Sequence, residues 1–413
     1  MVSLQKRTRT KEVAKKLRHY AIHFQRERHL RFCNPRARLR RSHHPRMKLA
    51  LIRRQFAAVG GAELYVQRLL SALVSAGHEV HFYAEKWQGA HPGVIMHTVP
   101  VKANRALGPI VFAEAVARLL TDHDYDVVFS LERTVNQDVY RAGDGLHRVW
   151  LQQRKRYASW WRRPFVGLGA FHANMQALEA RTFDPANTRH IIVNSDMVKQ
   201  EILSHFPFPA ERIHLIRNGV ETARFQNQDR AAMRAQFGYK DSDFVLLFVG
   251  SGWERKGLPF LLRLMRQWQT SQPDVKLLVV GKGRLGSKPP PNVTLAGPMK
   301  NVEEAYAAAD LMTFLPIYEP CANVIAEALS SGLPVITSRF NGASELIEPG
   351  INGHILEDPA NLPSLQTAIH YWKSKFDRHP VPTKLPLDLD TNVQSTLHLL
   401  ESVAAQKKLK TTV

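Results

Sequence analysis

The stretch Leu315-Pro-Ile-Tyr-Glu319-Pro-Cys-Ala-Asn-Val-Ile-Ala-Glu327-Ala-Leu-Ser-Ser-Gly332-Leu-Pro-Val-Ile-Thr decides the fold. The apolar residues at 309–316 predict a short buried strand, and the apolar spacing after Pro320 predicts a helix that Gly332 ends. Glu319 is therefore expected in a loop and Glu327 in the first turns of the helix. The N–H groups that open such a helix have no internal partner, so they form a site for an anion or a hydroxyl group.

Two carboxylates eight residues apart are common, because the macrodipole alone favours a Glu near a helix N-terminus. Here Glu319, Glu327 and the Gly332-Leu-Pro-Val tail resemble the donor motif of retaining glycosyltransferases of family 4, group 1. Residues 320–323 stand where many members have a Gly-Phe-Gly loop, and the lipopolysaccharide-core glucosyltransferases of the family also lack that loop. The resemblance implies the GT-B architecture, an α/β fold of two Rossmann-like domains that face each other across a cleft.

The composition is typical of a globular protein with more than one domain. The chain has 413 residues, of which 44% are hydrophobic, and this length exceeds what one core supports. No apolar run reaches the roughly eighteen residues of a transmembrane helix. The two cysteines, Cys33 and Cys321, are far apart and indicate neither a disulfide framework nor a metal site. We therefore expect a cytoplasmic protein that uses no metal and no other cofactor.

The formal net charge of +21 is concentrated at the N-terminal end. Residues 1–46 contain fifteen Lys or Arg and two Glu, a net +13. The segment lacks an apolar h-region, so it is not a secretory signal. It fits a disordered basic arm, an amphipathic membrane-surface segment, or sequence ahead of a start at Met47. We expect a disordered arm, and nothing aromatic or glycine-rich in it favours nucleic-acid binding.

Residues 47–216 predict an N-terminal, acceptor-side Rossmann-like domain. A buried strand at 48–52, a helix at 62–76 and a strand at 79–83 form a βαβ unit. The pair Gly60-Gly61 opens its helix, where a backbone can approach a phosphate closely. Glycine pairs often form a turn that has no role in binding. Here the pair occupies the position of the family's glycine loop, so the resemblance implies contact with the donor diphosphate.

A further carboxylate, Asp144, follows the sequence Asp138-Val-Tyr beyond a strand predicted at 126–130. The core glucosyltransferases resemble this chain in having Asp-Val-Tyr followed by an Asp, which implies that Asp144 faces the acceptor. An Asp between two glycines is equally typical of a surface turn. Both interpretations stay open.

The segment 148–163 interleaves aromatic residues with cations. They are Trp150, Tyr157, Trp160 and Trp161 with Arg148, Arg154, Lys155, Arg156, Arg162 and Arg163. This pattern suits an anionic membrane boundary, a packed helix with snorkelling arginines, or stacking on nucleic-acid bases. With the family resemblance, the membrane surface ranks first, the packed helix second and nucleic acid a distant third, so no nucleic-acid partner is expected.

Residues 217–375 predict a C-terminal, nucleotide-sugar-binding Rossmann-like domain, and residues 376–413 a closing tail with a helix. An apolar strand at 244–250 leads into Arg255 and Lys256, where cations can neutralise a diphosphate, although charged loops are common. The family has an Arg early in this loop and a Lys before its last glycine. Ser251 replaces that Arg, so the resemblance implies a role for Lys256 and leaves Arg255 as a substitute.

The resemblance as a whole implies a retaining, metal-independent hexosyltransferase. The implied donor is a nucleotide-diphosphate sugar such as UDP-glucose, and the implied acceptor is a lipid-linked saccharide such as lipopolysaccharide core. The candidate catalytic residues are Glu319, Asp144 and Lys256, and the candidate donor-binding residues are Gly60, Gly61, Arg255, Lys256, Ala322, Asn323 and Glu327. Amides of residues 320–323 would help Glu319 hold the sugar, and Glu327 would accept hydrogen bonds from the ribose.

The expected enzyme is a monomer on the inner face of the inner membrane, where it meets its acceptor on an anionic surface. Two other classes stay open. A sugar-nucleotide epimerase of GT-B fold would need acid and base residues in the cleft. A basic nucleic-acid- or membrane-binding protein without catalysis would bind nucleic acid with a steep salt dependence.

Overall fold

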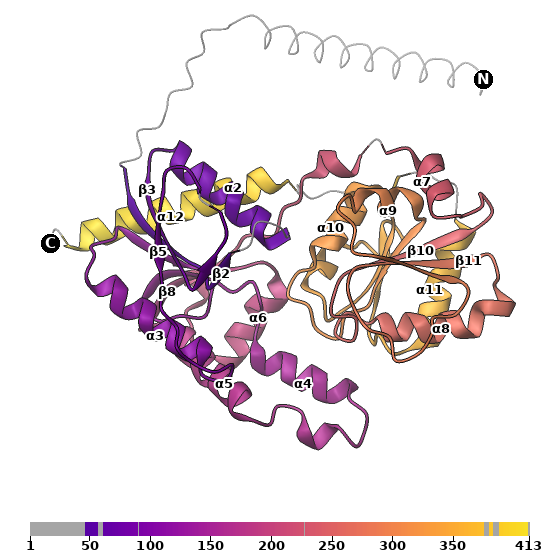
Figure 1. Ribbon diagram of the computed structural model, residues 1–413, viewed down its shortest axis with the longest axis horizontal. Helices are drawn as coiled ribbons and strands as arrows, with labels where there is room; N and C mark the ends of the chain where they lie inside the picture. Colours follow the sequence, from indigo (N-terminus) through magenta and orange to yellow (C-terminus); the bar gives the residue numbers. More distant parts are fainter. Residues whose placement is uncertain are drawn as a thin grey trace, which may run out of the picture. The chain divides into compact units, whose positions relative to one another are not determined.

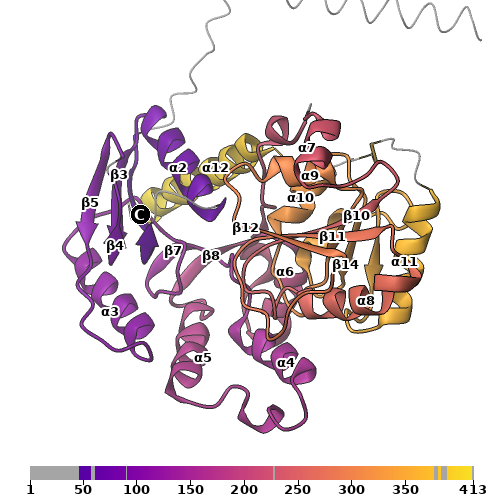
Figure 2. The ribbon, with the colours of Figure 1, turned by 45° about the vertical axis from the view of Figure 1, so that its right-hand side comes forward.

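The computed structural model describes residues 46–56, 61–89, 91–226, 228–375, 380–382 and 388–411. Residues 46–413 form one compact unit, with two parallel β-sheets and helices packed on them (Figures 1 and 2). The basic arm predicted over 1–46 lies outside the described residues except for Arg46. In the ranges given above, no helix combines the length and the apolar character needed to cross a bilayer.

The first sheet has seven strands in the order β5-β3-β1-β6-β7-β8-β9. They are β1 Lys48–Ile52, β3 Glu79–Ala84, β5 Val94–Thr98, β6 Val127–Ser130, β7 Gln137–Arg141, β8 Thr188–Val193 and β9 Ile213–Leu215. Two short strands, β2 Gln55–Phe56 and β4 Lys86–Trp87, pair separately. The helices of this half are α2 Gly61–Ser75, α3 Gly108–Thr121, α4 His147–Tyr157, α5 Ala170–Thr182 and α6 Asp196–His205.

The second sheet has six strands in the order β12-β11-β10-β13-β14-β15. They are β10 Phe244–Val249, β11 Val275–Val280, β12 Val293–Gly297, β13 Leu311–Phe314, β14 Val335–Ser338 and β15 Gly353–Leu356. The helices are α7 Arg230–Gln236, α8 Leu258–Ser271, α9 Glu303–Ala308, α10 Asn323–Ser330 and α11 Leu362–Ser374. The four 3₁₀ turns among the described residues are η1 Arg163–Phe165, η2 Ala210–Arg212, η3 Thr222–Phe225 and η4 Gly342–Leu346.

The last helix, α12 Leu389–Thr411, returns to the first sheet and lies beside α2 (Figure 1). Its side chains Val393, Leu397 and Leu400 share one buried cluster with Leu69 and Leu73 of α2. A helix was expected within the closing tail 376–413, and α12 is that helix. The domain boundaries at 46, 216 and 375 stay predictions.

The predicted strand–loop–helix around Glu319 is confirmed. Strand β13 ends at Phe314, and α10 begins at Asn323, so Glu319 lies in the loop and Glu327 is the fifth residue of the helix. Gly332 has φ +77°, a conformation that glycine adopts without strain. Ser195 caps α6 by accepting a hydrogen bond from the Val198 N–H at 3.3 Å.

Strand β7 was not predicted, because three of its five residues are polar: Gln137, Asp138 and Arg141. All five residues are nevertheless buried. Their polar atoms find partners on neighbouring elements, so burial costs little. The Asp138 carboxylate accepts a hydrogen bond from the Val128 N–H at 2.9 Å, and the Gln137 amide donates one to the Thr188 hydroxyl at 2.7 Å.

Candidate active site

A cleft of about 570 Å³ opens where strands of both sheets reach their carboxyl ends. In parallel α/β sheets this edge is the usual place for a ligand, because the loops that follow the strands meet there. The first half contributes Arg53, Glu132, Arg141, Asp144 and Asn194. The second half contributes Lys256, Glu319, Ala322, Asn323 and Glu327.

Six of the predicted site residues line this cleft together: Asp144, Lys256, Glu319, Ala322, Asn323 and Glu327. Asp144 lies in an exposed turn after β7 and lines the cleft, so the surface-turn interpretation holds, while a role at the acceptor stays a prediction. Gly60 lies outside the described residues. Gly61 is the first residue of α2, and its contact with the donor stays a prediction.

The loop that carries Glu319 is fixed through its main chain and its carboxylate. Its N–H donates to the Phe340 carbonyl at 2.8 Å, and its carbonyl accepts from the Gly342 N–H at 2.9 Å. The Glu319 Oε2 lies 2.8 Å from Arg255 Nη1, which also donates to the Tyr318 carbonyl at 3.2 Å. Arg255 therefore holds Glu319 in place and does not itself line the cleft.

Lys256 differs from Arg255, because it lines the cleft and is largely enclosed. Burial lowers the pKa of Lys256, while the nearby carboxylates of Glu319 and Glu327 act in the opposite direction. Among the described residues, no carboxylate lies within 4.0 Å of its Nζ, which sits 5.6 Å from the centre of the Phe314 ring. A partly buried cation with no close counter-ion among the described residues is suited to an anionic ligand.

The N-terminus of α10 opens on the same cleft. Ala322 stands at the N-cap position and supplies no side-chain acceptor, which leaves the first N–H groups of the helix available. The expectation that all amides of residues 320–323 assist Glu319 is wrong for Ala322. Its N–H donates to the Asn341 Oδ1 at 3.2 Å, because that side chain reaches across from the loop after β14.

Glu327 lies in the second turn of α10 and lines the cleft. The Tyr306 hydroxyl donates to its Oε2 at 2.6 Å. Burial raises the pKa of Glu327, although the Tyr306 bond and the cations Arg224 and Lys256 counteract the rise. The carboxylate is thus held in one orientation by a neighbour that itself is buried.

Comparison with known protein families identifies the type of enzyme to which this cleft belongs. Residues 59–224 match the family described as Glycosyltransferase Family 4, and residues 243–372 match the family described as Glycosyl transferases group 1. The chain belongs to the family 4, group 1 glycosyltransferases. The two matches fall on the two halves of the molecule, and the cleft lies at the strand ends of both.

Individual relatives are similar to this glycosyltransferase over most of its length. Lipopolysaccharide glucosyltransferase WaaG of Escherichia coli (strain K12) is 25% identical over 327 residues, which are 75% of this chain and 85% of the relative. A D-inositol 3-phosphate glycosyltransferase of Arthrobacter sp. (strain FB24) is 26% identical over 350 residues, which are 73% of this chain and 80% of the relative.

Solved structures confirm the predicted GT-B fold. The crystal structure of WaaG, a glycosyltransferase involved in lipopolysaccharide biosynthesis, matches with a TM-score of 0.67 at 22% identity, over 87% of this chain and 98% of that chain. HepE of Anabaena in complex with UDP and glucose matches with a TM-score of 0.60 at 21% identity, over 86% of this chain and 100% of that chain.

Glu132 and Arg141 are among the residues of the first half that line the glycosyltransferase cleft but were not predicted. Glu132 follows β6 and accepts a hydrogen bond from the Arg54 N–H at 3.2 Å; burial, and then the charge of Asp144, raise its pKa. Arg141 ends β7 and lies 4.3 Å from the centre of the Tyr65 ring. Glu132 could have been found as the second residue after a predicted strand, whereas Arg141 was hidden by the missed strand.

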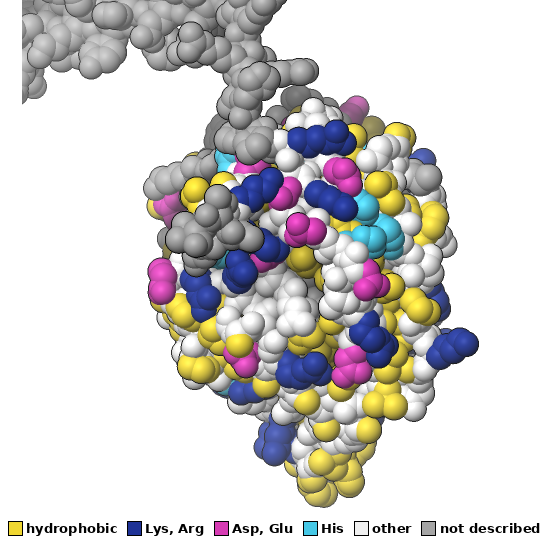
Figure 3. All heavy atoms as spheres, turned by 90° about the vertical axis from the view of Figure 1, so that its left-hand side faces the viewer, with side chains coloured by type: hydrophobic (Ala, Val, Ile, Leu, Met, Phe, Trp, Pro, Cys, Tyr) yellow, Lys and Arg dark blue, Asp and Glu magenta, His cyan; other side chains and the backbone are white. Residues whose placement is uncertain are grey.

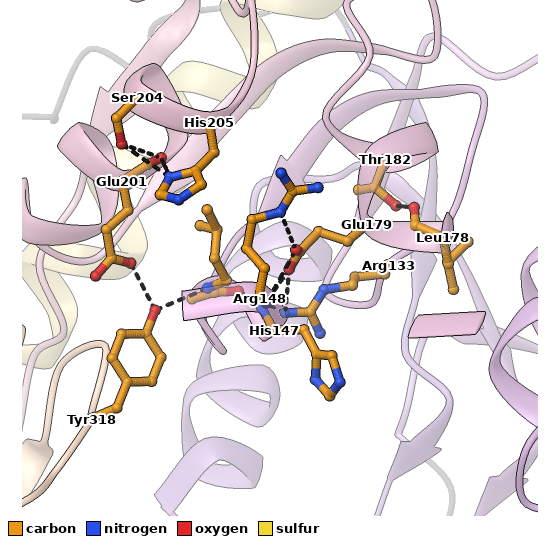
Figure 4. Close-up of polar contacts among 12 residues, drawn as sticks. Arg133, His147, Arg148, Leu178, Glu179, Thr182, Glu201, Ser204, His205 and Tyr318 are labelled. Atoms are coloured by element: carbon orange, nitrogen blue, oxygen red, sulfur yellow. Dashed lines mark hydrogen bonds and ion pairs between the residues drawn. The ribbon is translucent and has the colours of Figure 1, made fainter. Parts of the chain in front are cut away.

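A polar network surrounds Glu179, near the loop after β7 (Figure 4). Glu179 of α5 is fully buried, accepts the His147 N–H, and faces Arg148 Nε at 3.3 Å and Arg133 Nη2 at 3.7 Å. Beside it, the Tyr318 hydroxyl donates to Glu201 Oε2 at 2.7 Å. The loop after β7 is thus supported by charges from α4, α5 and α6.

Glu201 gives the network a pH dependence that unfolding experiments can detect. Burial raises the pKa of Glu201 to about 7, the Tyr318 bond lowers it, and the charge of Glu179 adds to the rise. A carboxyl whose folded pKa exceeds its unfolded pKa binds protons more tightly when folded, so stability falls as pH rises from about 4.5 to about 7.

We expect Glu201→Gln to remove this fall, because the amide carries no charge but can still accept the Tyr318 bond. Above pH 7 the variant should be more stable than the wild type by on the order of 1–3 kcal/mol, and at pH 5 equal to it. Urea unfolding across pH 4.5–8 measures the difference. Glu211→Gln, which removes an exposed carboxylate, is the control; the same gain there would assign the effect to net charge alone.

Proposed function

We propose that this glycosyltransferase moves a hexose from a nucleotide-diphosphate sugar, such as UDP-glucose, to a lipid-linked saccharide, such as lipopolysaccharide core, with retention and without a metal. The observation that carries the proposal is the pairing of enclosed Lys256 with the uncapped N-terminus of α10. Both favour an anion, and both line the cleft that also holds Glu319 and Glu327.

In the proposed reaction, the bond from the anomeric carbon to the diphosphate oxygen breaks and a bond to the acceptor oxygen forms on the same face of the sugar. The acceptor hydroxyl proton passes to the departing phosphate oxygen. Negative charge grows on the leaving group through an oxocarbenium-like state. Lys256 and the N–H groups of Asn323 and Val324 stabilise that charge, and they are preorganised for it because the fold already holds them.

The carboxylates serve binding in this proposal. Glu327, oriented by Tyr306, accepts hydrogen bonds from the ribose hydroxyls, and Glu319, oriented by Arg255, accepts them from the hexose hydroxyls. Asp144, on the opposite side of the cleft, faces the acceptor. A glucosyl donor is supported by two similar proteins: WaaG is a lipopolysaccharide glucosyltransferase, and HepE of Anabaena has been solved in complex with UDP-glucose.

The proposed place of action is the anionic inner face of the inner membrane, which the protein reaches as a peripheral monomer. A lipid-linked acceptor is confined to that surface. The segment 148–163, which belongs to the half built on the first sheet, carries exposed aromatic and basic side chains that support this attachment. The Discussion describes the experiment that tests it.

Glu327→Ala is expected to weaken donor binding while the fold stays intact. Each lost charge-assisted hydrogen bond costs about 1.5–3 kcal/mol, so the Kd for UDP-glucose should rise about 10- to 100-fold. Calorimetry after a thermal-shift and hydrolysis screen of nucleotide sugars measures it. Glu304→Ala, a carboxylate of α9 outside the cleft lining, is the matched control.

Three outcomes would contradict the proposal. Unchanged donor affinity in well-folded Glu327→Ala would exclude the ribose contact. Absence of stabilisation by every nucleotide sugar in the screen would exclude the donor class. Binding of a donor without sugar transfer to any lipid-linked saccharide would exclude the acceptor class.

A further inference from the structure

Tyr318 occupies a junction between the two halves of the cleft. It immediately precedes Glu319 in the loop after β13, and only 2% of its surface is exposed. Its hydroxyl donates to Glu201 Oε2 at 2.7 Å and accepts from the Leu146 N–H at 2.9 Å (Figure 4). Both partners belong to the half built on the first sheet, so one phenol oxygen connects the Glu319 loop to that half.

The loop after β7 is shaped around this hydroxyl. Gly145 has φ +64°, and a Cβ there would collide with the Tyr318 hydroxyl and approach Pro320 Cγ to 2.9 Å. The Gly145 carbonyl accepts from Arg133 Nη2 at 2.6 Å, which fixes the other side of the loop. Because Asp144 directly precedes Gly145, the position of its carboxylate depends on how the loop rests against Tyr318.

The two halves have further contacts that do not involve this hydroxyl. The Ser195 hydroxyl donates to the Pro320 carbonyl at 2.7 Å, and the Met197 N–H donates to Glu345 Oε1 at 2.9 Å. The phenol ring itself packs in a buried cluster with Leu146 and Val149. Removing only the hydroxyl therefore leaves the fold and the packing in place while it releases the Leu146 N–H and the Glu201 carboxyl.

We infer that Tyr318 is a positioning residue, which sets the Asp144 loop against the Glu319 loop so that sugar transfer to the acceptor depends on its hydroxyl. The inference rests on the proposed function for its activity readout. Displacement of a reacting group by about 1 Å can cost about 100-fold in rate. The donor contacts of Lys256 and Glu327 do not pass through Tyr318, so donor affinity stays the same.

The test is Tyr318→Phe, assayed with UDP-glucose and a lipid-linked core oligosaccharide. We expect transfer kcat to fall about 10- to 100-fold, the Kd for UDP-glucose to change less than about twofold, and hydrolysis of UDP-glucose to persist. Glu201→Gln, which keeps an acceptor for the phenol, should transfer within about threefold of wild type. Glu201→Leu, which has no acceptor, should behave like Tyr318→Phe, and the double variant should lose no more than either.

Hydrogen exchange supplies a readout that does not need activity. In Tyr318→Phe the amides of residues 143–147 should exchange about tenfold faster, because the Leu146 N–H has lost its buried partner, while the strands of both sheets stay protected. If Tyr318→Phe does not fold, Glu201→Leu takes its place in the transfer assay, because the Tyr318 hydroxyl then lacks its acceptor.

Three results would overturn the inference: unchanged exchange at residues 143–147, transfer by Tyr318→Phe within twofold of wild type, or an equal loss of donor affinity and transfer. Faster local exchange in a protein whose wild type transfers no sugar would instead overturn the proposed function alone.

Discussion

Lys256→Ala is expected to lower sugar-transfer turnover by about 100- to 1,000-fold, the size of effect seen when one preorganised donor is removed from a developing anion. The wild-type ammonium is enclosed and has no carboxylate within 4.0 Å among the described residues, so its charge is available to a ligand. The measurement is kcat with UDP-glucose as donor. The loss should appear mainly in kcat, because the charge on the leaving group grows as the bond breaks.

Arg255→Ala provides the comparison for Lys256→Ala and should cost less. The guanidinium contacts Glu319 Oε2 at 2.8 Å and the Tyr318 carbonyl, so its removal loosens Glu319 without taking a charge from the cleft lining. Lys282→Ala, an exposed cation after β11, is the control for net charge. If Arg255→Ala and Lys256→Ala together leave turnover unchanged, the loop after β10 does not face the diphosphate.

The core elements were predictable because burial on both faces imposes apolar sequence. Strand β10 is wholly apolar and completely covered, and its bounds agree with the strand predicted at 244–250 within one residue. The loop and helix around Glu319 were predictable for a related reason, since helical spacing begins and ends sharply at Pro320 and Gly332. The hydrophobic pattern of a segment was enough to predict its secondary structure wherever that segment packs only against apolar surfaces.

The parts that were not predictable depend on partners distant in sequence. Nothing in the sequence near Arg255 indicates that it pairs with Glu319, and nothing near Ala322 indicates that Asn341 takes its N–H. Strand β7 was missed because its polar residues are satisfied by β6 and β8 side chains and N–H groups. Each of these polar groups could have bonded to a ligand or to another part of the protein. Which of the two it does depends on the folded structure and cannot be read from the neighbouring sequence.

The structure divides the aromatic and basic segment 148–163 into a packed part and an exposed part. In α4, Arg148 faces buried Glu179 at 3.3 Å, and the Tyr157 hydroxyl donates to Asp358 at 3.0 Å. Trp150 lies against His147 with 5.4 Å between ring centres. The packed-helix interpretation therefore holds for these three side chains, and they are not available to a membrane.

The exposed part follows α4 and extends beyond the predicted segment. It consists of Trp160, Trp161, Phe165 and Leu168, which are 81%, 53%, 70% and 65% exposed. In Figure 3 hydrophobic side chains form the lowest, projecting end of the molecule, with Lys and Arg side chains above them. Exposed cations flank the aromatic residues in sequence: Arg154, Lys155, Arg156, Arg162 and Arg163.

We expect Trp160→Ala with Trp161→Ala, combined with Arg154→Gln, Lys155→Gln and Arg156→Gln, to abolish binding to anionic vesicles while donor hydrolysis persists. Each Lys or Arg near an anionic surface contributes about 1 kcal/mol, and interfacial Trp adds apolar burial. Three lost cations alone amount to more than a 100-fold loss. Sedimentation with phosphatidylglycerol vesicles, and with neutral phosphatidylcholine vesicles as reference, measures it.

The chain shortened to begin at Met47 decides which part of the protein attaches. It should still bind the anionic vesicles, because the exposed aromatic residues and their flanking cations remain, and added salt should weaken the binding. Trp87→Ala, an exposed Trp on β4 far from this segment in sequence, is the matched control and should bind as the wild type does. If the shortened chain fails to bind while the full chain binds, residues 1–46 attach the protein to the membrane, and the exposed Trp160 and Trp161 do not.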